Sequence, residues 1–441
     1  MTNQNTLPKG KNAAKASFGS EIDLFTKHID AIGHVLIGMV VALQEASKRS
    51  QNKLVSFEDR VCNVVENDQG RTVTIPSMHV KEWRGLKRKY EHFGISRGLL
   101  PRSLLVSLIS QYDAYLGRIL RTIFVRKPEI LNSADKQISF EMLSKFASID
   151  AAREYVLEKE VENILRSSHA EQFKWMENTF KLPLTKDLEI WPAFMEITER
   201  RNLFVHTDGM VSSQYMTVCK LHKCTLDESI NEGDRLDVPQ GYFNAAHKCI
   251  YEIGVKLGHV LWRKLFPDER EAADDNYNRL TYDLIENGKF DLAIRLLDFG
   301  CNEFKKFSNE INELVMTVNR AQAYKWNGQE EICRKIMRNI DWSAKGDQFR
   351  IANFALAEDW ESVRKVMVRI GRDGPVSMDC YRDWPLFVEL RKQEIFLTTY
   401  EEIFGEKFGD GLEVKKTEIP SSAEESAMNE GNAEADEIVG N

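Results

Sequence analysis

The sequence predicts an all-α protein built from two or three domains. Apolar residues recur three and four positions apart through most of the 441 residues, which is the spacing of an amphipathic helix. A chain of this length exceeds the usual size of one domain. Its composition, 42% hydrophobic and 29% charged residues, is typical of a globular protein that buries a sizeable core.

Charge and cysteine content narrow the class further. The net charge of −8 argues against nucleic-acid binding over the whole surface, although a local basic patch remains compatible with it. The seven cysteines are scattered and odd in number, which favours free thiols in a reducing cytosol over a disulfide framework. No signal peptide is recognised, so a cytoplasmic location is expected.

The N-terminal part comprises a polar segment, a helix and a short connection. Residues 1–18 are rich in Lys, Asn and Ala and are expected to be disordered. Residues 19–80 should hold a helix over about 21–48 and a connecting segment. The apolar stretch Ile32–Leu43 is too short to cross a bilayer, so we expect a buried helix and no membrane partner. Between residues 61 and 76, short β-branched runs flank Asn67–Gly70, which indicates a small β-hairpin.

A basic stretch follows, over residues 81–127. It carries eleven Lys and Arg residues against three acids, a local charge of 11 − 3 = +8. Near its start, basic and aromatic residues alternate in the manner of a phosphate-binding surface. The candidate RNA-binding residues are Arg84, Lys87, Arg88 and Lys89. The alternative is a solvated helix face without a ligand.

A long helix is predicted to start near Pro101, and Asp113 is its only acidic residue. Two partners are open to this carboxylate. It can be the counter-ion of a buried arginine further along the chain, Arg201, or it can be exposed and pair with a basic neighbour such as Arg118.

The segment from Pro192 to Gly209 carries the most informative polar residues of the chain. Pro192 suits the first turn of a helix and Gly209 suits its end. At 100° per residue Arg201 falls inside the apolar stripe, where a guanidinium needs an anion. Asn202 and His206 are four positions apart and are therefore neighbours on one flank. An arginine, an amide and an imidazole on adjoining faces suit a phosphodiester better than a metal ion or an acyl group.

The cysteines and histidine after this segment do not predict a metal site. Cys219, His222 and Cys224 lie close in sequence, but a zinc site needs a fourth ligand at regular spacing and none is near. We therefore expect no metal and no cofactor. A closing helix over residues 242–266 carries Gly254 and Gly258, which would allow another helix to approach closely.

The sequence pattern of the C-terminal third is typical of helical repeats. Residues 267–276 are acidic and polar and suggest a domain boundary. Over 276–409, helix–turn–helix units follow one another with turns at Asn287–Gly288, Asn327–Gly328 and Glu358–Asp359, at periods of about 40 and about 31 residues. Such units stack into a solenoid. They resemble degenerate tetratricopeptide repeats. Residues 410–441, with nine acids and two lysines, are expected to form a disordered acidic tail.

The middle of the chain, about residues 80–265, resembles the HEPN superfamily. The resemblance rests on the R-x4-H motif from Arg201 to His206, with Asn202 in its polar second position. The flanking residues 200–209, followed by Tyr215, are similar to the RiboL-PSP-type prokaryotic branch, and Asp113 lies in an upstream helix where such domains often carry an acid. Asp208 departs from the nucleotidyltransferase-paired branch, which has tyrosine there, so modification of that tyrosine is not expected.

The resemblance implies a HEPN-like helical bundle over residues 81–267 that acts as a metal-independent endoribonuclease. His206 would be the general base or acid, and Arg201, with Arg200, would stabilise the charge on the phosphate. Asn202 would orient the phosphate or the imidazole. Asp113 would hold Arg201 in place. The products would be a 2′,3′-cyclic phosphate and a 5′-hydroxyl. It further implies a homodimer, an RNA substrate and a role as a bacterial toxin or phage-defence effector. The repeats would then bind a sensor partner or an antitoxin.

Two other interpretations stay open. The bundle can be a non-catalytic RNA-binding or dimerising scaffold, or Arg201 can be a satisfied buried arginine and His206 a helix cap. Catalysis requires Arg201, Asn202 and His206 to lie on one open cleft, near a plausible two-fold surface, whereas a histidine sealed in the core would exclude it.

Overall fold

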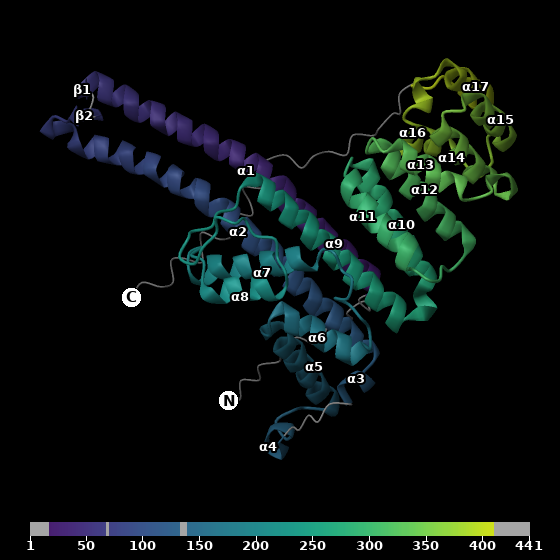
Figure 1. Ribbon diagram of the computed structural model, residues 1–441, viewed down its shortest axis with the longest axis horizontal. Coiled ribbons are helices and arrows are strands. Elements are labelled where there is room, and N and C mark those ends of the chain that lie inside the picture. Colours follow the sequence, from purple (N-terminus) through teal and green to yellow (C-terminus); the bar gives the residue numbers. More distant parts are fainter. Residues whose placement is uncertain (1–16, 68–69, 133–138, 410–441) are drawn as a thin grey trace, which may run out of the picture. The chain divides into compact units, whose positions relative to one another are not determined.

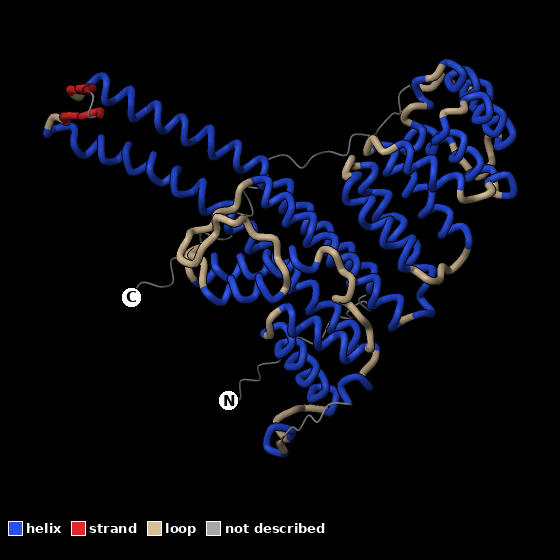
Figure 2. The backbone as a smooth tube through the Cα atoms, viewed as in Figure 1, coloured by secondary structure: helices blue, strands red, loops and turns tan. Residues whose placement is uncertain are grey.

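The computed structural model describes residues 17–67, 70–132 and 139–409, and it is all-α, as predicted, apart from one two-stranded sheet (Figure 2). The chain divides into two compact units, residues 1–339 and 340–441. The expected disorder of residues 1–16 and the expected acidic tail of 410–441 lie outside the described residues. Phe18, which we assigned to the polar tail, is fully buried and begins the first helix.

Two long helices, α1 (Phe18–Val61) and α2 (Val80–Arg126), lie side by side as an antiparallel pair (Figure 1). At one end they are joined by β1 (Asn63–Asn67), β2 (Gly70–Thr74) and the 3₁₀ turn η1 (Ser77–His79). The strands pair antiparallel with Val64 opposite Val73, which confirms the predicted hairpin. We call the projecting part of this pair, residues 39–100, the arm.

The arm corrects two expectations. The predicted helix start at Pro101 is wrong, because Pro101 lies inside α2. A proline removes a single main-chain hydrogen bond, and α1 packs alongside to support α2 across that point. The expected burial of Ile32–Leu43 is also wrong for much of this stretch: Leu36 is buried, but Val35, Met39 and Val41 are 44%, 43% and 55% exposed. From there on, α1 has left the bundle and contacts mainly α2.

The same stretch bears on membranes. Among the described residues, α1 is the one helix whose length and apolar composition would allow it to cross a bilayer. In its most apolar stretch of 18 residues, 12% is buried. Its N-terminal part, by contrast, packs into the bundle through Phe18, Ile22, Phe25 and Ile29.

The bundle surrounds the inner halves of α1 and α2. Its other helices are α3 (Glu129–Asn132), α4 (Phe140–Leu143), α5 (Ile149–Arg166), α6 (His169–Phe180), α7 (Trp191–His206), α8 (Ser213–Leu221) and α9 (Gln240–Leu265). A Cβ on Gly254 would lie 2.3 Å from the Phe25 ring, and one on Gly258 would lie 2.1 Å from Tyr115 Oη. These glycines therefore permit the close helix approach that we expected. Tyr115 Oη also donates a hydrogen bond to the Gly254 carbonyl at 3.1 Å.

Beyond α9, the first unit continues through the 3₁₀ turn η2 (Pro267–Glu269), α10 (Arg270–Glu286), α11 (Phe290–Glu303), α12 (Glu310–Trp326) and α13 (Glu330–Arg338). The expected boundary at 267–276 is helical for most of its length. Asp274 of α10 is buried and pairs with Arg263 of α9 at 2.6 Å. The turns between α10 and α11 and between α12 and α13 use Gly288 and Gly328, both with positive φ, so two of the helix–turn–helix units are present as expected.

The second unit contains the third helix–turn–helix unit, α14 (Asp347–Ala357) and α15 (Trp360–Ile370). It also holds the 3₁₀ turn η3 (Trp342–Ala344), α16 (Met378–Asp383), the 3₁₀ turns η4 (Pro385–Phe387) and η5 (Leu390–Lys392), and α17 (Glu394–Phe404). Aromatic rings fill its C-terminal end, where Tyr381 and Tyr400 are fully buried.

The buried His259 on α9 should make folding of the first unit sensitive to pH. Burial, and then the charge of Arg263, lower its pKa well below the ordinary 6.5. Between pH 6.5 and the lowered pKa, the unfolded chain binds a proton at His259 that the folded chain does not. The free energy of unfolding should therefore decrease as the pH falls, by up to about 1.4 kcal/mol per pH unit. We expect the urea midpoint to drop between pH 7.5 and 5.5, and His259→Leu to make the drop smaller. An unchanged pH dependence in His259→Leu would contradict the assignment.

Candidate active site around Arg201 and His206

Helix α7 carries the R-x4-H motif, and its local sequence sets both of its ends. Pro192 lies in the first turn, and Phe194 and Ile197 anchor the helix in the core. After His206 the chain leaves the helix at Asp208 (φ 53°) and Gly209 (φ 86°), and the Gly209 amide donates to the Leu203 carbonyl at 3.0 Å. The predicted helix and its glycine end are therefore confirmed.

Arg201 is held by a carboxylate from another helix. Its Nη2 lies 3.3 Å from Asp113 Oδ2, and its side chain is 21% exposed. Arg118 pairs instead with Glu21 at 2.6 Å. Of the two partners open to Asp113, the structure thus shows Arg201. The Arg201 side chain is held by this carboxylate and is partly exposed, while its Nε is buried and has no hydrogen-bond partner among the described residues.

A histidine completes this ion pair from a third helix. His169 Nε2 lies 2.9 Å from Asp113 Oδ1, so the two oxygens of one carboxylate bind two different side chains. The His169 side chain is 7% exposed. We did not identify this residue from the sequence. It is the first residue of α6, directly after the N-cap Ser168, and no spacing in the chain links it to Asp113.

Arg200 lies in a separate, buried polar cluster. Its Nε donates to Glu196 Oε1 at 2.7 Å, and its guanidinium stacks over the Tyr242 ring at 4.0 Å. The hydroxyls of Tyr215 and Tyr242 each donate to Glu196 at 2.6 Å. Burial, and then the negative charge of Glu196, raise the pKa of both tyrosines, which keeps them as donors. The structure therefore does not bring the Arg200 side chain to the Arg201–Asp113 pair.

His206 and Asn202 occupy the solvent side of α7. The His206 side chain is exposed and Asn202 is partly exposed. Asn202 Nδ2 donates to Glu199 Oε1 at 3.4 Å, whereas His206 forms no hydrogen bond or ion pair with any side chain that the structure describes. The imidazole is therefore not sealed in the core, and its exposure meets one part of the condition that catalysis sets.

The end of α7 is tied to α2 by a group of charges that we did not foresee. Arg102 of α2 binds Asp208 Oδ1 at 3.3 Å and Asp237 Oδ1 at 3.2 Å. It also stacks over the Phe204 ring at 5.4 Å. Asp208 pairs with Arg235 as well. These contacts fix the turn that follows His206.

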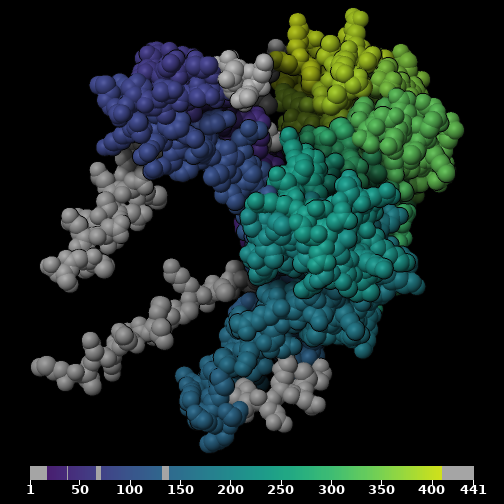
Figure 3. All heavy atoms as spheres, turned by 60° about the vertical axis from the view of Figure 1, so that its left-hand side comes forward, coloured from purple at the N-terminus to yellow at the C-terminus, as the bar shows by residue number. Residues whose placement is uncertain are grey.

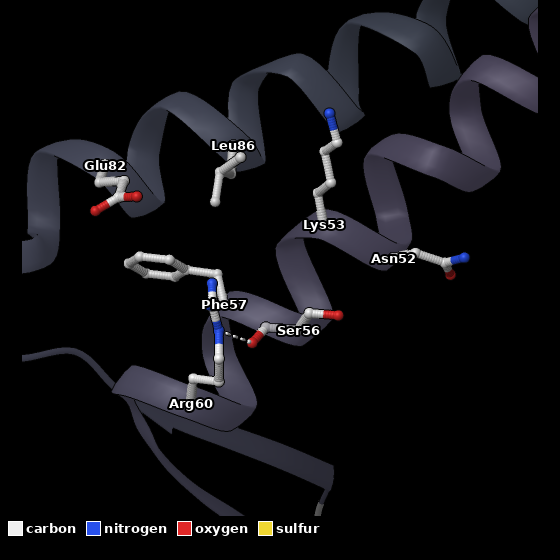
Figure 4. Close-up of a pocket in the computed structure, with 7 residues that line it drawn as sticks. All are labelled: Asn52, Lys53, Ser56, Phe57, Arg60, Glu82 and Leu86. Carbon is white, nitrogen blue, oxygen red and sulfur yellow. Dashed lines mark hydrogen bonds between the residues drawn. The ribbon is translucent and has the colours of Figure 1, made fainter.

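The four candidate RNA-binding residues lie on the arm, far from the motif. Arg88 precedes Asp113 by 25 residues on one helix, which corresponds to about 38 Å along the axis. A pocket of about 350 Å³ also lies on the arm, between α1 and α2 (Figure 4). It is lined by Asn52, Lys53, Ser56, Phe57, Arg60, Glu82 and Leu86, and by no residue of the motif.

The structure offers no metal site within the described ranges, where no group of three or more His, Cys, Asp and Glu residues is placed to hold an ion. His222 accepts a hydrogen bond from Trp191 Nε1 at 3.2 Å. The neighbouring Cys224 thiol, and then burial, raise the pKa of Cys219. These side chains have contacts of their own within the fold.

Comparison of the chain with protein-family models, with curated proteins and with solved structures finds no match. The functional argument therefore rests on the geometry of the residues themselves.

Proposed function

We propose that the protein is a metal-independent endoribonuclease of the HEPN type. His206 takes the proton from a ribose 2′-hydroxyl, the 2′-oxygen attacks the adjacent phosphorus, and the P–O5′ bond breaks while the 5′-oxygen takes up a proton from solvent. The products are a 2′,3′-cyclic phosphate and a free 5′-hydroxyl. Arg201 stabilises the charge that grows on the phosphate oxygens, and Asn202 orients the phosphate or the imidazole.

The observation that carries this proposal is the contrast between the two charged members of the motif. Arg201 is anchored through Asp113 and His169, whereas His206, five residues further on, is exposed and has no described partner. An anchored cation and an exposed imidazole, five residues and about 140° apart on one helix, are the two kinds of group that general acid–base cleavage of a phosphodiester uses. Arg200 has a structural role in this scheme, because Glu196 and Tyr242 occupy its guanidinium.

Dimerisation through the bundle is part of the proposal. Val205 and Met210, which flank His206 in the sequence, are 51% and 42% exposed. Apolar residues beside an exposed imidazole suit a second copy of the chain, which would bring its own motif to a shared cleft. The helix–turn–helix units over 276–409 would bind a protein partner, a sensor or an antitoxin, and the biological role would be that of a cytoplasmic toxin or phage-defence effector.

The alternative function is a non-catalytic RNA-binding or dimerising scaffold. The Asp113–Arg201 pair alone would serve such a protein equally well, because an anchored guanidinium also stabilises a fold. The exposed His206 meets a requirement of catalysis that a scaffold does not impose, and cleavage itself distinguishes the two functions.

Incubation of the purified full chain with total bacterial RNA, in EDTA, tests the proposed function. We expect fragments that end in 2′,3′-cyclic phosphate and begin with 5′-hydroxyl, and the same yield with and without the chelator, because no step uses a metal. Mass spectrometry of the fragment ends, together with end-labelling that depends on a 5′-hydroxyl, checks the result. Intact RNA at high protein concentration, from a dimeric and folded sample, would favour the scaffold.

A further inference from the structure

We propose that one face of α2 is a binding track for double-helical RNA, which leads from the arm to the Arg201–His206 motif. The proposal rests on the proposed function, because it names the class of substrate that the site receives: an RNA with a base-paired stem next to the cleaved segment.

Helical register places the track. Arg84 and Arg102 are 18 residues apart in one continuous helix, which is five turns, so they lie on the same face about 27 Å apart. Arg88 deviates from the Arg102 direction by about 40°, and Ile95 by about 20°. The distal arginines of the arm and Arg102 therefore share one line along α2.

The contacts of Arg102 show towards which part of the bundle this face of α2 is turned. Its guanidinium pairs with Asp208, which lies two residues after His206, and with Asp237, and it covers the Phe204 ring of α7. The face that carries Arg84 and Arg88 is therefore the one that turns towards the end of the motif helix. Figure 3 shows a hollow between the arm, drawn in purple and blue, and the teal part of the bundle that includes α7 and α8.

The four basic candidates on the arm differ in whether their charge is already paired and in the side of α2 on which they lie. Arg84 and Arg88 are exposed and form no ion pair with a carboxylate of the described residues. Lys87 Nζ lies 3.9 Å from Glu91 and 4.9 Å from the centre of the Trp83 ring, so part of its charge is already balanced. Lys89 lies about 140° around the helix from Arg84, on another side. The track thus presents two free guanidinium groups, which suit phosphate.

The track fits a duplex better than a single strand. Single-strand binding relies on exposed aromatic rings for base stacking. Here Trp83 is half-buried and donates to Glu58 at 2.9 Å, and Tyr90 and Phe93 are also half-buried. Between the two free guanidinium groups and Arg102, the same side of α2 carries the apolar, exposed Ile95 and Leu99. Proteins recognise a base-paired stem by its backbone and shape, so a face with free guanidinium groups and no fully exposed aromatic ring suits a duplex.

Binding of labelled RNA to the full chain tests the track without any need for cleavage. The parent protein carries His206→Ala, and the probes are a 20-base-pair RNA duplex and a 20-nucleotide oligouridine, both followed by fluorescence anisotropy between 50 and 200 mM KCl. The test variant is Arg84→Gln with Arg88→Gln, and the matched control is Lys89→Gln, which removes one exposed charge from another side of the same helix.

We expect the double variant to weaken duplex binding about tenfold at 100 mM salt, and to lower the slope of log K against log salt by about 2, one unit for each lost phosphate contact. Lys89→Gln should change the affinity less than twofold. Equal effects of the two variants, no effect of the double variant, or tighter binding of oligouridine than of the duplex would each overturn the track. If duplex binding behaves as expected while the wild type cleaves no RNA, the proposed nuclease fails and the track stands.

Discussion

Replacement of His206 by alanine should reduce RNA cleavage by about 10²- to 10⁴-fold, the usual contribution of a general acid or base. The imidazole is exposed and binds no described side chain, so its removal leaves the packing of α7 intact. We therefore expect the melting temperature to stay unchanged while the rate collapses. Single-turnover cleavage of a labelled RNA, with thermal unfolding of the same samples, measures both quantities.

A matched histidine elsewhere provides the control. His34 is also exposed but lies on α1, outside both the motif and the arm, and His34→Ala should cleave at the rate of the wild type. The pH–rate profile adds a second criterion, because loss of a titrating catalytic group removes one limb of the profile, whereas a structural effect lowers the rate at every pH. Equal rates for His206→Ala and His34→Ala would exclude the nuclease mechanism.

The position of the Arg201 guanidinium depends on two residues of other helices. Asp113 and His169 bind neither substrate nor product in this scheme, and they act by fixing the guanidinium of Arg201. The two oxygens of Asp113 are each bound by a different side chain, so the position of Arg201 depends on three helices, α2, α6 and α7. In the proposed mechanism, this arrangement fixes the cation that stabilises the transition state before RNA binds, and such preorganised charges stabilise a transition state most effectively.

Local sequence was sufficient for the motif helix and its main ion pair. Apolar spacing placed α7, glycine placed its end, and the cost of burying a charge required a counter-ion for Arg201, with Asp113 as one of two candidates. The small hairpin over 61–76 was also predictable, because β-branched runs flank a turn sequence. Each of these features depends on residues close in sequence or on a charge balance with few solutions.

Long-range pairing was not predictable in the same way. His169 meets Asp113 across 56 positions, and Tyr242 meets Glu196 across 46, so only the packing of the bundle brings them together. The arm was not predicted from the sequence, for a different reason. An apolar run such as Ile32–Leu43 has the same pattern on a buried helix and on an exposed hairpin, and Pro101 indicates a helix start unless a neighbouring helix supports the chain through it.

Glu196 should be among the most sensitive positions for stability. Its carboxylate accepts hydrogen bonds from Arg200, Tyr215 and Tyr242 in a buried setting. Glu196→Ala would leave a buried guanidinium without its counter-ion, which costs about 3–5 kcal/mol. Because this cluster holds α7, α8 and the start of α9 together, we expect hydrogen–deuterium exchange in α7 to accelerate by at least two orders of magnitude.

Two further variants separate the charge effect from simple loss of packing. Glu189→Ala, just before α7, removes an exposed carboxylate and should leave exchange unchanged. Glu196→Leu combined with Arg200→Met removes both charges and keeps apolar volume, so it should recover most of the stability that Glu196→Ala loses. If the double variant exchanges as fast as Glu196→Ala, the loss comes from the tyrosine hydroxyls. If Glu196→Ala itself exchanges like the wild type, the cluster does not hold the motif helix, and the rigidity assigned to Arg201 must come from Asp113 alone.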